Sequence, residues 1–129
     1  MSMPSVESQW KVIFHAEFAP EFIQLSEPVR QKIIALAKLL TIFGPHLARP
    51  KADTLKGSSH SNMKELRFDA DEGVWRVAFA FDLKRRAILL VCGDKSRVSQ
   101  TEFYKKLIHV ADRRFSQHQQ AVSAEREKR

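Results

Sequence analysis

Three predicted strands that follow one another closely constrain the fold of this chain more than any other feature. Apolar residues alternate with polar ones over residues 63–69 and 74–82, and residues 86–93 contain the apolar run Ile88–Cys92, so each segment is a predicted strand. The connections around 69–73 and 82–85 are short, whereas parallel neighbours need a crossover of a dozen or more residues. The sequence therefore predicts a three-stranded antiparallel meander.

A long helix is predicted before this meander. Ser26 is a suitable N-cap, and Pro28 suits the first turn because its missing amide hydrogen would have no partner there. The apolar residues that follow are spaced by four, three, four and three positions and share one helical face: Val29, Ile33, Leu36, Leu40 and Phe43. We expect this face to pack in the core; the alternative is a groove for a partner helix. Gly44 and Pro45 end the helix.

The other segments are shorter or less regular. Residues 10–15 are a predicted strand, and residues 19–25 a helical turn. Ser99 and Glu102 have the spacing of a capping box, so a last helix is expected from there to about residue 119. Residues 44–62 form a long basic connection, in which we expect either a short helical turn around 52–55 or a functional loop.

The order of elements, β-α-α-β-β-β-α, predicts an α+β fold with a small antiparallel sheet and helices packed on one face. A chain of 129 residues suffices for one domain. We expect that domain to cover residues 10–119, between a flexible N-terminus (1–9) and a charged C-terminal tail (120–129).

The charge is unevenly distributed. The net charge is +7, and residues 1–43 contribute none of it, with four basic and four acidic side chains. Residues 44–129 hold eighteen basic and eleven acidic side chains. Such a surface suits an anionic partner, either nucleic acid or an acidic protein; a basic surface that serves only solubility is the alternative.

Several chemistries are excluded by what the sequence lacks. Its one cysteine, Cys92, cannot form an intrachain disulfide and lies in an apolar run, so it is interpreted as a core residue. Without a phosphate-binding glycine motif or a metal-ligand spacing, neither a cofactor, a metal nor a small-molecule ligand is expected. The chain shows no bilayer-spanning apolar run and no secretory signal, which predicts a cytoplasmic protein without membrane contact.

Two arginines on the predicted meander form the candidate site. Arg67 and Arg76 should point to the same, helix-free side of the sheet, where Ala78 and Ala80 would leave a shallow hollow. Guanidinium groups bind phosphate oxygens bidentately, so this hollow suits a phosphate backbone. The alternative is a solvated face on which Arg67 pairs with Glu65 or Asp69.

Four short motifs resemble the RelE/ParE toxin superfamily, and its phage-derived, HigB-like branch in particular. They are NMKELRF (62–68), VWRVAF (74–79), AILLV with GDK (87–91, 93–95) and FYKK (103–106). The resemblance implies a toxin of a type II toxin–antitoxin system that cleaves mRNA, usually on the ribosome, without metal. It also implies a helix-turn-helix antitoxin as partner. A ParE-like toxin that poisons gyrase and an inactive binding module remain alternatives.

The resemblance also suggests roles for single residues. The family's catalytic arginine corresponds to Arg76, and the expected catalytic set is Arg76, Arg67, Lys95, Tyr104 and Glu65. Glu65 stands where RelE proteins commonly have a lysine, which leaves Glu65 or His60 as candidate general bases. The expected RNA-binding set is Lys51, Lys56, Lys64 and Arg97, of which Arg97 is also an alternative to Lys95 as the basic residue after the last strand.

Overall fold

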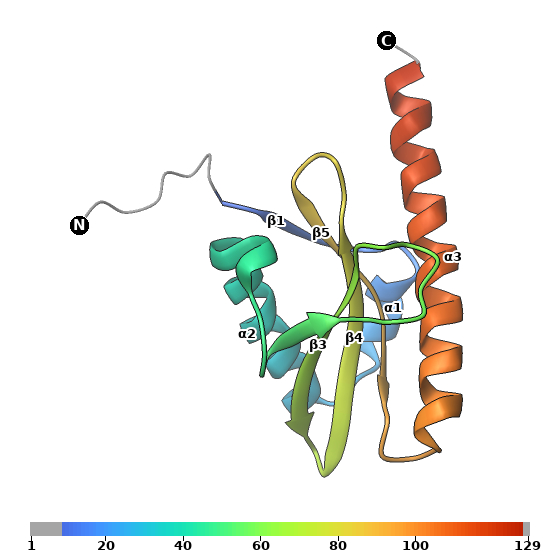
Figure 1. Ribbon diagram of the computed structural model, residues 1–129. Helices are drawn as coiled ribbons and strands as arrows, with labels where there is room; N and C mark the ends of the chain where they lie inside the picture. Colours follow the sequence, from blue (N-terminus) through green and yellow to red (C-terminus); the bar gives the residue numbers. More distant parts are fainter. Residues whose placement is uncertain (1–8, 128–129) are drawn as a thin grey trace, which may run out of the picture.

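The structure is a computed structural model that describes residues 9–127. It contains five strands and three α-helices (Figure 1). In chain order the elements are β1 (Lys11–Phe14), α1 (Phe18–Ile23), α2 (Glu27–Phe43), a 3₁₀ turn (Gly44–His46), β2 (Ala52–Thr54), β3 (Met63–Ala70), β4 (Gly73–Phe81), β5 (Arg86–Asp94) and α3 (Gln100–Glu127). The N-terminal flexibility expected from the sequence concerns residues 1–9, nearly all of them outside the described part.

The predicted meander is confirmed, but the sheet is larger and mixed. Its strand order is β1-β5-β4-β3-β2. β3, β4 and β5 pair antiparallel as expected, and β2 adds a short antiparallel strand beside β3. β1 pairs with β5 in parallel, which corrects the expectation of a purely antiparallel sheet. The long segment between β1 and β5, with two helices and three strands, permits this parallel return.

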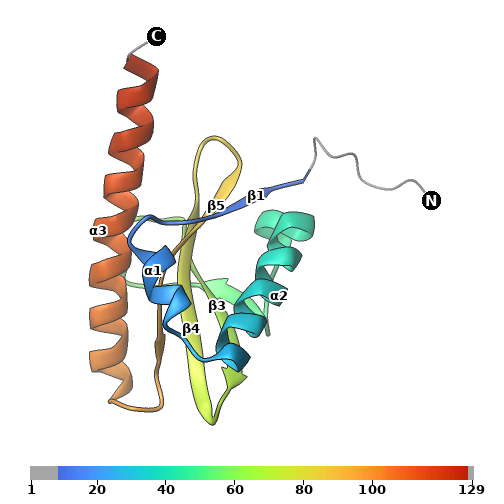
Figure 2. The ribbon, with the colours of Figure 1, turned by 180° about the vertical axis from the view of Figure 1, so that it is seen from behind.

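Helices cover both faces of the sheet, whereas the sequence led us to expect helices on one face. Figures 1 and 2 show α1 and α2 on one side of the strands and α3 on the other. Alternation along β4 explains this arrangement, because Val77 and Phe79 pack toward α2 while Ala78 and Ala80 pack toward α3. Small alanines on the second face allow α3 to approach the sheet closely. The α+β class itself is confirmed.

The predicted face of α2 is mostly in the core. Val29, Ile33, Leu36 and Leu40 are buried, as their spacing predicted. Phe43 is the exception, with 48 % of its surface exposed, because the helix ends there and Gly44 redirects the chain. Ser26 lies at the N-cap with extended backbone angles, although its hydroxyl makes no capping hydrogen bond.

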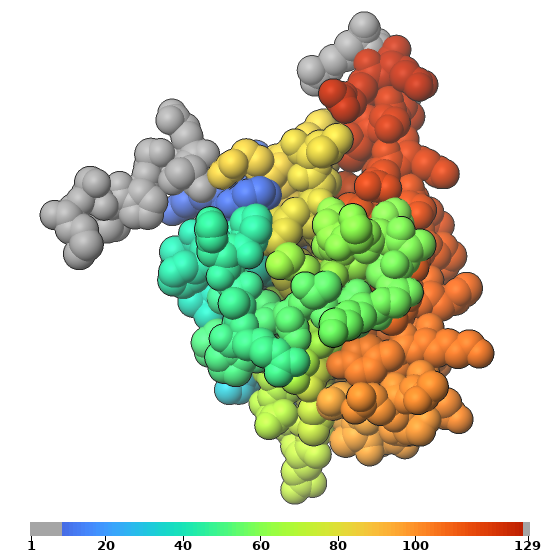
Figure 3. All heavy atoms as spheres, viewed as in Figure 1, coloured from blue at the N-terminus to red at the C-terminus, as the bar shows by residue number. Residues whose placement is uncertain are grey.

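Residues 44–62 contain a strand where a helical turn was one expectation. β2 lies in this segment and pairs with residues 64–66 of β3. Beyond β2 the chain crosses the molecule from the α2 side to α3, as the green atoms in Figure 3 show. There the hydroxyl of Ser58 and the amide of Ser59 donate hydrogen bonds of 2.5 and 2.9 Å to Asp112 of α3. Side-chain bonds of this kind hold an irregular segment in place.

The last helix begins as predicted and ends later. The amide of Glu102 donates to the Ser99 hydroxyl at 3.2 Å, which is the N-terminal half of the expected capping box. The helix continues to Glu127 rather than ending near residue 119. The later part of the helix lies beside the β4–β5 turn, where Asp82 lies 2.9 Å from His118 and Lys84 pairs with Glu125 at 3.5 Å.

Candidate active site

Two arginines face each other across β3 and β4. The backbone register pairs Arg67 with Arg76 and Glu65 with Ala78. Ala78 packs under α3, so side chains of the same alternation lie on the α3 face of the sheet. The prediction that both arginines share one face is confirmed, but that face is not free of helices.

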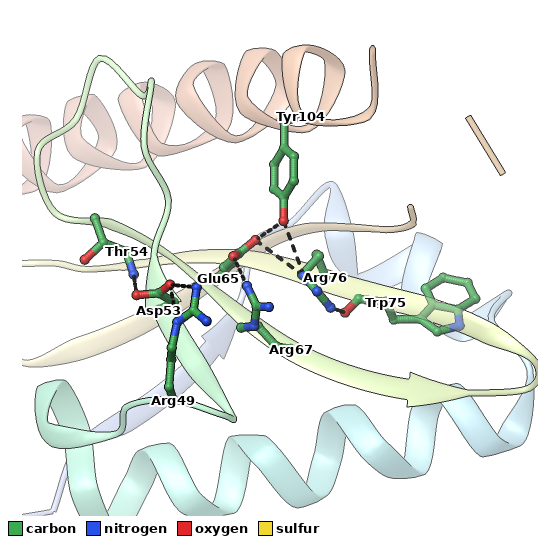
Figure 4. Close-up of polar contacts among 8 residues, drawn as sticks. All are labelled: Arg49, Asp53, Thr54, Glu65, Arg67, Trp75, Arg76 and Tyr104. Atoms are coloured by element: carbon green, nitrogen blue, oxygen red, sulfur yellow. Dashed lines mark hydrogen bonds and ion pairs between the residues drawn. The ribbon is translucent and has the colours of Figure 1, made fainter. Parts of the chain in front are cut away.

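Glu65 lies at the centre of this cluster, as Figure 4 shows. Only 4 % of its surface is exposed. Its Oε2 accepts a hydrogen bond of 2.9 Å from Nη1 of Arg67, and its Oε1 accepts one of 2.9 Å from the Tyr104 hydroxyl. The same Oε1 lies 3.8 Å from Nε of Arg76. The buried carboxylate is therefore paired and hydrogen-bonded, as burial of a charge requires.

The two arginines differ in how open they are. Arg76 has 6 % of its side chain exposed and is held at 3.3 Å to the Tyr104 hydroxyl oxygen and at 2.9 Å to the carbonyl of Trp75. Arg67 has 23 % of its side chain exposed. Arg67 is therefore the more accessible guanidinium, while Arg76 is buried and held by two hydrogen bonds.

Close packing of α3 brings Tyr104 to the sheet. Gly93 of β5 lies opposite Arg76 in the register. A Cβ atom at Gly93 would lie 2.9 Å from Cε1 of Phe103, which is too close for an ordinary contact. The missing side chain lets the first turns of α3 lie against the sheet, and this places Tyr104 over Glu65 and Arg76.

The cluster changes the acidity of Tyr104 and of the neighbouring Lys95. Burial, and then the hydrogen bond that its hydroxyl donates to Glu65, raise the pKa of Tyr104. Burial, and then the positive charges of Arg76 and Arg67, lower the pKa of Lys95. Lys95 therefore lies within electrostatic range of both arginines, and its ammonium gives up a proton more readily than a free lysine.

A family model described as "Phage derived protein Gp49-like (DUF891)" matches residues 20–116. This chain belongs to the Gp49-like family. Two curated relatives from Mycobacterium tuberculosis carry toxin names, HigB2 at 38 % identity over 95 residues and HigB3 at 39 % over 93 residues. The matches cover 73 % of the chain and 47 % of HigB2, and 72 % of the chain and 79 % of HigB3. The chain thus spans about half the length of HigB2. The HigB-like resemblance is confirmed.

Two solved structures share the fold of the Gp49-like chain. One is a variant of the E. coli toxin RelE in the free state, with a TM-score of 0.55 and 10 % identity over 78 % of this chain and 94 % of that one. The other is the archaeal RelE–RelB complex from Pyrococcus horikoshii OT3, with a TM-score of 0.50 and 18 % identity. That match covers 70 % of this chain and 99 % of the chain in the complex. At these identities the likeness concerns the fold alone.

The hollow expected above Ala78 and Ala80 of the Gp49-like chain is filled. Both alanines are fully buried and pack with Phe103 and Leu107 of α3. Their small size serves helix packing rather than ligand binding, which corrects the sequence-based interpretation.

Three of the other expected site residues lie apart from Glu65. Lys64 is opposite Phe79 in the register, so its side chain starts on the α2 face. Lys56 is exposed in the segment that follows β2. Arg97 has 82 % of its side chain exposed and contacts Asp94 at 3.3 Å.

His60, the alternative base, is held away from the arginines. Its Nε2 lies 3.0 Å from the Ser116 hydroxyl, and its ring packs edge-on against Phe115 of α3. Of the two candidate bases, Glu65 is therefore the one that the fold places among the arginines.

The lone cysteine, Cys92, is not a reactive thiol. Burial raises the pKa of Cys92 to about 12, so its thiol stays protonated at neutral pH. Between residues 9 and 127 there is no group of three potential metal-ligating side chains.

Among residues 9–127 no helix is long and apolar enough to cross a membrane.

A groove that sequence reasoning missed adjoins the cluster. It has a volume of about 600 Å³ and runs between α2 and the edge of β3. Arg67 and Arg76 line it from the sheet, Lys51 from the segment before β2, and Lys32 from α2. Lys32 lies outside the apolar stripe of α2, so periodicity offered no signal that its side chain borders the arginines.

Proposed function

We propose that this Gp49-like protein is the toxin of a type II toxin–antitoxin pair, and that it cleaves mRNA on the ribosome. The cluster of Glu65, Arg67, Arg76 and Tyr104 carries the proposal, because it combines cations, a carboxylate and a hydroxyl in one partly open site. The toxin names of HigB2 and HigB3 and the RelE-like fold support the same function. The reaction proposed needs no metal or other cofactor.

The proposed reaction is an internal transesterification of RNA. The 2′-oxygen of one nucleotide forms a bond to the adjacent phosphorus, and the bond from phosphorus to the 5′-oxygen of the next nucleotide breaks. The products are a cyclic phosphate and a 5′-hydroxyl. A base must take the proton from the 2′-hydroxyl, an acid must protonate the leaving 5′-oxygen, and cations must stabilise the phosphorane between these steps.

The cluster and the neighbouring Lys95 together offer a group for each role. Arg67 and Arg76 stabilise the charge of the phosphorane, and Glu65 accepts the 2′-hydroxyl proton. Lys95 delivers a proton to the leaving oxygen, since its lowered pKa brings it nearer to the working pH. The raised pKa of Tyr104 keeps its hydroxyl protonated, so that it can orient Glu65 and Arg76.

Further basic side chains suit the RNA backbone. We propose that Lys51, which lines the groove beside Arg67, and the exposed Lys56 and Arg97 contact phosphates farther along the RNA. Lys64 is not among the residues that line the groove beside the arginines and is left out of this set. We propose that the ribosome positions the mRNA, because holding the reacting groups in the right geometry lowers the barrier to cleavage.

A cognate antitoxin is the proposed second partner. The P. horikoshii structure that shares the fold is a complex of RelE with RelB. We propose that a helix-turn-helix antitoxin covers the basic surface of this chain and represses the operon that encodes the pair. Its acidic side chains would complement the net charge of +7.

Controlled expression in bacteria tests the proposal. The wild type, Arg76→Ala and Arg126→Ala are induced without an antitoxin, and growth and mRNA 5′ ends are followed. Arg126 is exposed near the end of α3, so its substitution is the matched control. We expect growth arrest and ribosome-associated mRNA cleavage from the wild type and from Arg126→Ala. Arg76→Ala should lower cleavage on the order of 10²–10³-fold.

Other results would assign a different function. DNA breaks with intact mRNA would point to a gyrase-directed toxin. Normal growth on induction of the wild type would point to an inactive binding module. Equal mRNA cleavage by the wild type and Arg76→Ala would show that the cluster is not the active site.

A further inference from the structure

The groove between α2 and β3 combines two kinds of surface. Its apolar part is formed by Ala35, Leu36 and Leu39 of α2 and by Phe68 of β3. Its charged part is formed by the cations of α2, β3, β4 and the segment before β2: Lys32, Lys51, Arg67 and Arg76. A volume of about 600 Å³ lies within the range of sites that hold small ligands.

This combination matches a single-stranded nucleotide. Bases of single-stranded RNA stack on aromatic and apolar side chains, while their phosphates lie against lysine and arginine. Phe68 is half-buried, with its ring parallel to that of Trp75 at a centroid distance of 6.4 Å, so its position is well defined. Among the described side chains that line the groove, Asp69 is the only acidic one.

The groove is continuous with the proposed active site. Arg67 and Arg76 line it and also contact Glu65. The backbone amide of Arg67 donates a hydrogen bond of 2.8 Å to the carbonyl of Lys51, which fixes Lys51 beside the arginine. A strand of RNA that placed one phosphate on Arg67 could therefore place the neighbouring nucleotide between β3 and α2.

We infer that this groove binds the nucleotide next to the cleaved phosphate, and that Lys32 of α2 contacts the phosphate of that nucleotide. The inference rests on the proposed function and adds a substrate subsite to it. An acidic protein segment could also meet lysines here. RNA is the occupant favoured by the structure, because the groove leads directly to the arginine pair and offers apolar surface for a base.

Binding of a non-cleavable RNA tests the subsite. The probe is a fluorescein-labelled oligonucleotide with 2′-O-methyl groups, and the variants are Lys32→Ala and Lys38→Ala. Both lysines are exposed on α2, but only Lys32 lines the groove, so Lys38→Ala is the matched control. We expect Lys32→Ala to weaken binding about five-fold at low salt and to reduce the salt slope by about one. Lys38→Ala should bind like the wild type.

The outcomes separate the subsite from the proposed function. The subsite is overturned if Lys32→Ala and the wild type bind the RNA with equal affinity. It is also overturned if Lys38→Ala loses as much RNA affinity as Lys32→Ala, or if the wild type binds no RNA. If Lys32→Ala binds RNA normally but binds the cognate antitoxin more weakly, the groove is instead a protein-docking site. Cleavage on ribosomes is measured separately: its loss in Arg76→Ala supports the function whatever Lys32→Ala does.

Discussion

The carboxylate of Glu65 lies 3.8 Å from Nε of Arg76, and neither side chain has more than 6 % of its surface exposed. Glu65 comes from β3 and Arg76 from β4, so their contact depends on the register of the hairpin. A buried carboxylate between two arginines and a tyrosine restricts the positions of their side chains. Glu65 therefore orients the arginines of the proposed active site.

Removing the charge of Glu65 should destabilise the protein. Glu65→Gln leaves Arg76 buried without its counter-ion, and the loss of one partner of a buried pair costs about 3 kcal/mol. Urea unfolding measures the change. The control is Glu125→Gln, which breaks an exposed pair with Lys84 and should change stability by less than about 1 kcal/mol. Equal effects of the two substitutions would contradict the buried role.

Inorganic phosphate should stabilise Glu65→Gln more than the wild type. In the variant the two guanidinium groups no longer share a carboxylate, so a phosphate ion can bind them bidentately. Ligand binding to the folded state raises the melting temperature. Thermal unfolding with phosphate, and with chloride at the same ionic strength, measures the effect. Identical phosphate-dependent shifts in the two proteins would count against the arginine pair as a phosphate site.

Tyr104→Phe should show whether the Tyr104 hydroxyl orients Glu65 and Arg76, because the substitution keeps the packing of the ring. The substitution keeps the ring but removes the hydroxyl that donates to Glu65 and accepts from Arg76. We expect a stability loss of about 1 kcal/mol, the usual value for one hydrogen bond. We also expect mRNA cleavage to fall on the order of ten-fold or more, because Arg76 and Glu65 lose their common partner. A purely structural hydroxyl would change stability and leave the rate of the folded protein unchanged.

Lys95 should lower the stability of the protein at neutral pH while it contributes to the proposed cleavage. Burial and the neighbouring arginines lower its folded-state pKa, so the unfolded chain binds its proton more tightly. This effect destabilises the protein at neutral pH and is relieved as pH rises from the lowered pKa toward the ordinary lysine value. Lys95→Met should therefore raise the melting temperature at pH 7 while it lowers cleavage. A lower melting temperature would contradict the repulsion from Arg67 and Arg76.

Gly93→Ala should displace the start of α3. The added Cβ would lie 2.9 Å from Cε1 of Phe103, and overpacking of this kind costs about 1–3 kcal/mol. Activity should fall as well, because Tyr104 follows Phe103 in the helix. Phe103→Leu in the same chain removes the clashing ring atom, so a double-mutant cycle should show a coupling in stability. Additive effects would mean that this contact does not position α3.

Local patterns in the sequence were sufficient for most elements. The β3–β4–β5 meander follows from strand-like segments joined by short links, and α2 from the spacing of Val29, Ile33, Leu36 and Leu40. The shared face of Arg67 and Arg76 follows from alternation along paired strands. Each of these inferences uses only residues near one another in the chain.

Contacts between distant segments could not be predicted in this way. A period of two marks both faces of β4 alike, so it did not reveal that Ala78 and Ala80 are covered by α3. Contacts of α3 with the β4–β5 turn, such as that between Asp82 and His118, likewise appear in no helical pattern.

The sequence by itself determined the meander, the arginine pair and the basic character of the surface, because alternation and charge are properties of neighbouring residues. Only the tertiary structure decided what surrounds the pair. Tyr104 lies 39 positions after Glu65 and reaches it because α3 folds across the sheet at Gly93. Lys32 borders the same arginines because α2 packs beside the edge of β3. The position of each depends on how helices pack against a sheet, which is decided by the whole core rather than by any single segment.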